Sequence, residues 1–145
     1  MSPMSLNRAG IAPILAALTL ASTGAAAQPL TPDPALVTGE LSNGMRYMIL
    51  EHANPPGRVN MYMHISSGSL NETEQTRGIA HFLEHMAFNG GENIAPGDVV
   101  PYFESLSMSF GRHLNAFTSF DQTTYTLSLP DTEISTLKKG FMFYE

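Results

Sequence analysis

The chain of 145 residues contains no cysteine and no tryptophan, and only 14% of its side chains are charged. The lack of cysteine excludes a disulfide scaffold, thiolate chemistry and cysteine-based zinc fingers. Seven basic residues stand against 13 acidic ones, giving a net charge of −6 without a basic run, so nucleic acid is not an expected partner. Eight phenylalanines and an apolar fraction of 43% argue against disorder, and the length suits one domain.

The N-terminus carries the longest apolar stretch, which is too short to span a bilayer. Arg8 precedes an apolar run over residues 11–20, and small residues then lead to Ala27. This order is typical of a secretory signal peptide, so we expect residues 1–27 to be removed. The alternative is a buried N-terminal helix, which Pro13 within the run disfavours.

A signal peptide implies export, so we expect a periplasmic or extracellular protein with no membrane span. Residues 28–38 contain three prolines and are expected to form an extended leader. The folded part is then expected to cover residues 39–145.

Strand and helix patterns alternate along this folded part, which predicts an α+β domain. Asn43-Gly44 predicts a two-residue hairpin turn followed by a strand to Leu50. The domain is expected to hold a mixed, largely antiparallel sheet with helices packed on one face. Further strands are expected at 59–65, 114–119 and 122–129, and helices at 78–88, 98–107 and 131–144.

The first of these helices has two distinct faces at a period of 3.6 residues. The apolar face, expected to pack inward, consists of Ile79, Phe82, Leu83 and Met86. The opposite stripe consists of His81, Glu84, His85 and Phe88.

Three residues of the second stripe form the pattern H-x-x-E-H, the reverse of the commoner H-E-x-x-H. His81 and His85 lie one turn apart, so both imidazoles can reach a single zinc ion. Glu84, if it is not a ligand, can take a proton from a zinc-bound water. The remaining histidines lack such a pattern and are interpreted as ordinary surface or turn residues; they are His52, His64 and His113.

The residues around this pattern resemble a known family. The stretch 78–90, with its H-x-x-E-H core, is similar to the signature of the insulinase/pitrilysin family of zinc peptidases. Leu41 to Met45 resembles the family's opening hairpin, and Gly68-Ser69 resembles its approach to the zinc helix. The segment 110–125 resembles its substrate strand, so the likeness covers about residues 39–145.

The resemblance implies specific roles for residues in this chain. It implies that His81 and His85 bind one zinc ion and that Glu84 is the general base. It also implies that Asn115, Ala116 and Phe117 lie on an edge strand near the zinc. A peptide or unfolded protein substrate can add to that edge as an extra strand.

Two departures from the family accompany these matches. Gly91 stands where relatives often carry threonine, and it has no identified catalytic role. The family's third zinc ligand is a glutamate in a later helix, at a distance from His85 that passes Glu145. The other glutamates after the motif do not lie in the matching segment; they are Glu92, Glu104 and Glu133.

The chain is therefore expected to be the N-terminal, truncated part of the peptidase domain of a larger zinc metalloendopeptidase. The remainder of its own chain would supply the third ligand and the chamber over the substrate. The isolated 145 residues are expected to be inactive, because catalytic zinc sites use three protein ligands. Two alternatives stay open: a non-catalytic homologue acting as a structural or processing-partner subunit, and a small histidine-based metal-binding module.

Overall fold

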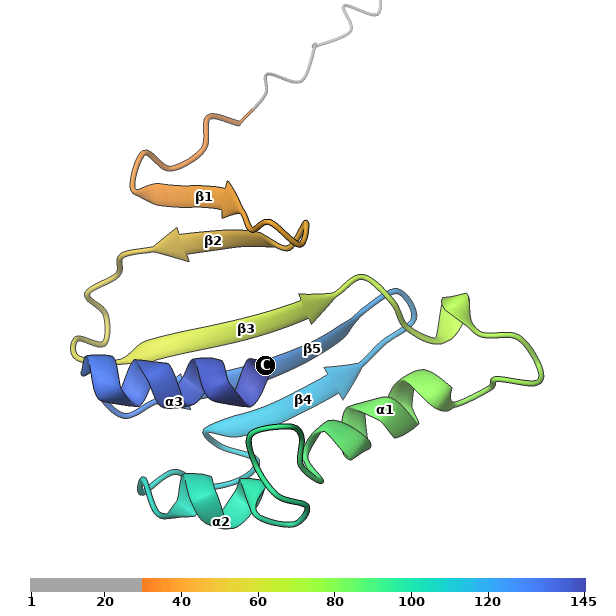
Figure 1. The fold of residues 1–145 in the computed structure, drawn as a ribbon. Coiled ribbons are helices and arrows are strands. Elements are labelled where there is room, and N and C mark those ends of the chain that lie inside the picture. Colours follow the sequence, from red (N-terminus) through yellow and green to blue (C-terminus); the bar gives the residue numbers. More distant parts are fainter. Residues whose placement is uncertain (1–29) are drawn as a thin grey trace, which may run out of the picture.

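The computed structural model describes residues 30–145 (Figure 1). The expected signal peptide lies outside these residues. The expected leader lies partly outside them, and its last residues belong to the first strand. The elements are β1 (Leu36–Glu40), β2 (Arg46–Leu50), β3 (Val59–Ile65), a 3-10 turn η1 (Ser69–Asn71), α1 (Ile79–Ala87), α2 (Val99–Glu104), β4 (Leu114–Thr118), β5 (Thr123–Leu129) and α3 (Ile134–Tyr144).

Strands β1 and β2 form an antiparallel hairpin of their own. The hairpin was predicted from Asn43-Gly44, but its loop holds three residues rather than two. The Leu41 N–H donates to the Met45 carbonyl at 2.8 Å, which leaves Ser42, Asn43 and Gly44 in the loop. Gly44 has a φ of 85°, a left-handed conformation that glycine adopts without a steric penalty.

The second sheet has three antiparallel strands in the order β3-β5-β4. All three strands were predicted, β3 and β5 from alternating apolar residues, and the structure confirms them within about one residue at each end. The central strand β5 is flanked by a hydrogen-bonded strand on each side, and its Leu127 and Leu129 are among the most buried side chains. Strand β4 is therefore an edge strand of the described sheet, with only an isolated bridge from Phe110 to Leu114 beside it.

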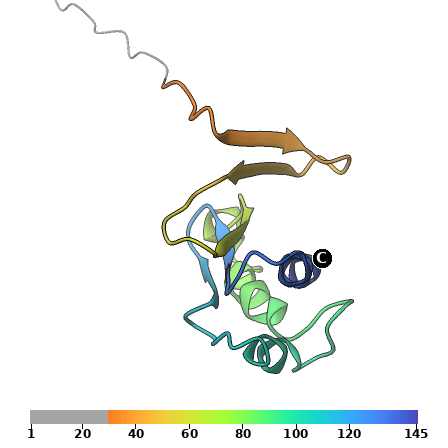
Figure 2. The ribbon, with the colours of Figure 1, turned by 90° about the vertical axis from the view of Figure 1, so that its left-hand side faces the viewer.

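Helices α1 and α3 pack on one face of this sheet, and α2 lies below the β4 edge (Figures 1 and 2), which confirms the predicted α+β class. No helix among residues 30–145 is both long and apolar enough to cross a membrane. The side chains buried between helices and sheet are Ile94, Val99, Phe103, Met108, Leu114, Leu127 and Leu129.

The other two predicted helices form with shifted ends. Helix α2 stops at Glu104 rather than near Ser107, which has a positive φ of 59°. Helix α3 starts after Glu133, whose N–H donates to the Asp131 carboxylate at 3.0 Å, so Asp131 supports the helix start from two residues before the cap.

A short segment fastens the loop before α1 to the turn between β4 and β5. The Ser69 N–H donates to the Ser119 carbonyl at 3.1 Å, and the Leu70 N–H donates to the Phe120 carbonyl at 2.7 Å. These bonds fix η1 against the sheet, and the chain reaches α1 from there. The position of α1 over the edge of the sheet is thus tied to the end of β4.

Candidate metal and peptidase site

The start of α1 is held by one carboxylate. Glu72 accepts the Gly78 N–H on Oε2 at 2.7 Å and the Ala80 N–H on Oε1 at 2.9 Å. These are amide groups that the first turn of a helix leaves without an internal partner. The hydrogen bonds lower the pKa of Glu72, the one from Ala80 having the larger effect. Glu72 is not among the residues predicted from the sequence, because it lies six residues before the Gly78 cap and reaches the helix start only when the intervening loop folds back.

One turn into the helix, two imidazoles converge. The Nε2 atoms of His81 and His85 lie 3.0 Å apart, and the ring centroids lie 4.6 Å apart. With a Zn–N distance of about 2.0–2.1 Å, two ligands of a tetrahedral zinc ion have nitrogens roughly 3.3 Å apart. Both rings are exposed. The pair therefore fits two positions of a zinc coordination sphere with little movement.

The carboxylate of the motif is buried against the sheet. Glu84 is only 8% exposed, and its Oε2 accepts the hydroxyl proton of Thr118 on β4 at 2.5 Å. Tyr125 on the neighbouring strand β5 lies close to the same charge. Burial raises the pKa of Tyr125, and the Glu84 carboxylate raises it further. Glu84 thus faces the part of the sheet beneath α1 that carries Thr118 and Tyr125.

This orientation contradicts the predicted inward packing of the apolar face. The side chains of that face are 42–60% exposed: Ile79, Phe82, Leu83 and Met86. The 3.6-residue period separates the two faces of a helix, but it does not determine which face meets a neighbour. Here Glu84 has a hydroxyl partner on the sheet, and that bond offsets the cost of burying a charge.

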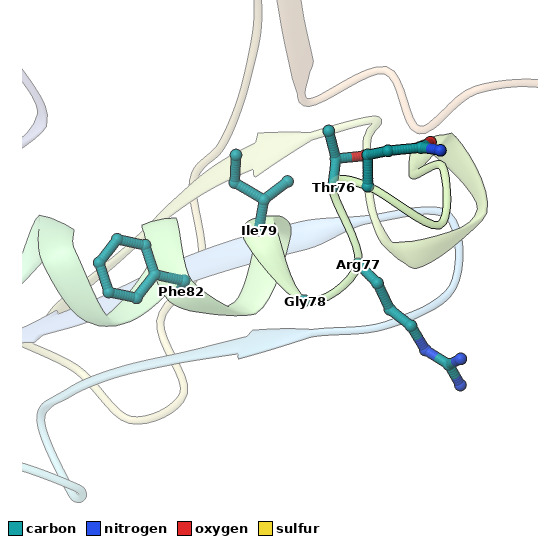
Figure 3. A pocket seen from close by; sticks show the side chains of 6 residues that line it. Thr76, Arg77, Gly78, Ile79 and Phe82 are labelled. Carbon is teal, nitrogen blue, oxygen red and sulfur yellow. The ribbon is translucent and has the colours of Figure 1, made fainter.

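An open hollow of about 300 Å³ lies at the N-terminal end of α1 (Figure 3). The apolar side chains of Ile79 and Phe82 line it on one side, and the Arg77 side chain points away from them. Neither the two histidines nor Glu84 belongs to its lining. The hollow is therefore separate from the candidate metal site.

The three residues predicted to bind substrate lie on the edge strand β4, next to α1 (Figure 1). Asn115 and Phe117 are exposed and point away from the helices, whereas Ala116 and Thr118 are half-buried on the helix side. The His113 carbonyl accepts the Ser128 N–H at 2.7 Å. Because hydrogen-bonded pairs alternate along an antiparallel ladder, the N–H and C=O groups of odd-numbered residues in β4 point toward β5. The N–H and C=O of Ala116 consequently point out at the free edge.

Each of the other histidines, which were interpreted as ordinary surface or turn residues, has a hydrogen-bond partner of its own. His52 Nδ1 accepts the Asn54 N–H at 2.9 Å, and His64 Nδ1 lies 3.1 Å from the Thr124 hydroxyl. His113 is half-buried, and its Nδ1 accepts the Ser109 N–H at 3.0 Å. Within residues 30–145, no three histidine or carboxylate side chains gather closely enough to hold a metal ion together.

A helix that bears H-x-x-E-H above the edge of an antiparallel sheet defines a domain of the inverted zinc-peptidase class. The chain belongs to the insulinase family, peptidase family M16, whose model matches residues 47–139. That match begins within the hairpin strand β2 and includes the H-x-x-E-H helix and the edge strand β4.

Individual relatives agree with this assignment. The chain is 46% identical over 113 residues to a protein named probable zinc protease PqqL from Escherichia coli, covering 78% of this chain and 12% of the relative. It superposes on the crystal structure of the first half of the E. coli periplasmic protease PqqL with a TM-score of 0.76, at 44% identity, covering 79% of this chain and 25% of that one. A predicted insulinase family protease from Yersinia pestis gives a TM-score of 0.66 at 31% identity, with 82% and 26% covered.

Proposed function

We propose that these residues belong to a zinc-dependent metalloendopeptidase in which His81 and His85 hold the single zinc ion. The observation that carries the proposal is the pair of converging imidazoles beside a buried carboxylate on one helix face. The chain spans about an eighth of the length of the curated relatives it matches. The third ligand and the walls of the substrate chamber are therefore proposed to come from further chain. The exposed apolar face of α1 fits such additional packing.

In the proposed reaction, Glu84 acts as the general base. When bound, zinc supplies Lewis acidity that polarises the scissile carbonyl and acidifies water. Glu84 takes a proton from the attacking water as the oxygen bonds to the carbonyl carbon. The C–N bond then breaks, and Glu84 returns the proton to the leaving amine. His81 and His85 keep their neutral form as metal ligands throughout.

The substrate is proposed to be a peptide or unfolded protein that lies along β4 in an extended conformation. The main chain of Ala116 offers one donor and one acceptor at the free edge, so binding by strand addition would tolerate many sequences. The exposed side chains of Asn115 and Phe117 flank this position and are proposed to complete the binding strand.

The protein is proposed to be exported to the periplasm or the extracellular space. The signal-peptide pattern of residues 1–27 supports this, and the similar E. coli protein PqqL is described as a periplasmic protease.

The proposal is tested by measuring zinc content and peptide hydrolysis together on three variants of the full-length protein. Glu84→Gln should keep about one zinc ion per chain and lower kcat by roughly 10²–10⁴-fold, because only the proton acceptor is removed. His81→Ala and His85→Ala should lose zinc and activity together. Full activity in Glu84→Gln would leave the mechanism without its base. A full-length wild-type protein that binds zinc without cleaving any peptide would instead support the non-catalytic homologue.

The isolated chain provides a second check. It should bind zinc weakly and cleave no peptide, since two imidazoles make an incomplete catalytic site. Chelator-sensitive cleavage by the purified 145-residue chain would show that a third ligand is recruited from within it.

A further inference from the structure

We propose that Thr118 is a positioning residue for Glu84, an inference that rests on the proposed role of Glu84 as general base. The two side chains come from different elements, α1 and β4, and are 34 residues apart in the sequence. Their 2.5 Å contact has the length of a hydrogen bond between a hydroxyl and an ionised carboxylate. Such a bond restrains the carboxylate in orientation as well as in position.

The bond occupies only one of the two carboxylate oxygens. Oε2 accepts from Thr118, and within the described residues Oε1 has no hydrogen-bond partner. No side-chain polar atom of the described residues is both fully buried and without a partner, so Oε1 must retain contact with solvent. Thr118 therefore divides the carboxylate into an anchored oxygen and an accessible one. The accessible oxygen is the one that can accept a proton from water.

Thr118 also connects the base to the proposed peptide-binding edge. It lies two residues after Ala116 on β4, and both side chains are on the helix side of the strand. The same short strand would thus position both the peptide, paired with Ala116, and the carboxylate, hydrogen-bonded to Thr118. The distance between base and scissile bond is then set by β4 rather than by the flexible side chain of Glu84.

The inference is tested by steady-state kinetics of the full-length protein with three substitutions. Thr118→Val keeps the shape and removes the hydroxyl, and it should lower kcat by roughly 10–100-fold, as loss of a supporting hydrogen bond does in metal sites. KM and zinc content should stay close to wild type. Thr118→Ser restores the hydroxyl and should recover most of kcat. Thr123→Val removes a buried hydroxyl from the residue paired with Thr118, and it should leave kcat unchanged.

A merely structural role for Thr118 predicts a different pattern. In that case Thr118→Val would change KM, stability and zinc content together, and Thr118→Ser would not rescue kcat specifically. Should Thr118→Val not fold, Thr118→Ala removes the same hydroxyl without adding bulk. Adding Thr118→Val to Glu84→Gln should cost nothing further, because Thr118 acts through the carboxylate. A fully active Glu84→Gln would refute the proposed base, whereas an inactive Glu84→Gln beside a wild-type Thr118→Val would refute the positioning role alone.

Discussion

Substituting alanine for Gly68 should loosen the segment that leads into α1, the helix that carries the H-x-x-E-H motif. Gly68 is buried, and a Cβ added there would lie 2.3 Å from the Ser119 carbonyl oxygen and 2.9 Å from the Gln122 nitrogen. These neighbours are backbone atoms, so no side chain can rotate away to make room. The substitution must push η1 away from the β4–β5 turn. It must also lengthen the hydrogen bonds that the Ser69 and Leu70 amides donate to that turn.

The expected cost follows from these contacts. Two backbone hydrogen bonds contribute about 0.5–1.5 kcal/mol each, and overpacking a tight site adds about 1–3 kcal/mol. We therefore expect local opening to become easier by about 2–6 kcal/mol. The assay is hydrogen exchange of the Ser69 and Leu70 amides in the full-length protein, which should speed up roughly 30-fold or more.

A matched glycine gives the control for this experiment. A Cβ added at Gly91 meets nothing within 4 Å, so Gly91→Ala should leave exchange in η1 unchanged. Unaltered protection of Ser69 and Leu70 in Gly68→Ala would refute the close-approach argument. It would also refute the view that this contact positions α1.

Three further predictions concern the helix start, the substrate edge and the mature terminus. Hydrogen bonds lower the pKa of Glu72 in the fold, so its stabilising contribution is present above its ordinary pKa of 4.5 and is lost as pH falls below it. Glu72→Gln should therefore lower the unfolding temperature at neutral pH. The unfolding temperature of this variant should also fall less than that of the wild type when the pH is lowered; equal falls in the two proteins would contradict this. Ala116→Pro removes a main-chain donor at the free edge without touching the β5 ladder, so KM should rise roughly 2–10-fold with zinc unchanged; an unaltered KM would place the peptide elsewhere. Mass spectrometry of the exported protein should find Gln28 at the N-terminus, and a product that retains Met1 would exclude cleavage.

The order of elements could be predicted because it depends on local patterns. Alternation over Val59–Ile65 and Thr123–Leu129 predicts half-buried strands, and both strands form as predicted. The Asn43-Gly44 hairpin was also predicted, but not its three-residue loop, since loop length depends on how the flanking strands pair. The H-x-x-E-H motif places two imidazoles one turn apart by helix geometry alone.

The environment of Glu84 could not be predicted in the same way. Periodicity indicated that Glu84 lies opposite the apolar residues of α1, and a charged face is ordinarily the solvated one. The structure reverses this because Thr118, distant in sequence, offers a hydroxyl at the site of burial. The same limit applies to Glu72, whose role appears only once the loop folds back on the helix start.

X-ray absorption at the zinc edge of the full-length protein, compared with its Glu84→Gln variant, tests the central claim most directly. If His81 and His85 hold the metal and Glu84 does not, both proteins should show the same nearest shell. That shell should contain two imidazole nitrogens at about 2.0–2.1 Å. A nearest shell that loses an oxygen in Glu84→Gln would make Glu84 a ligand, and one without two imidazoles would contradict the assignment of the histidine pair.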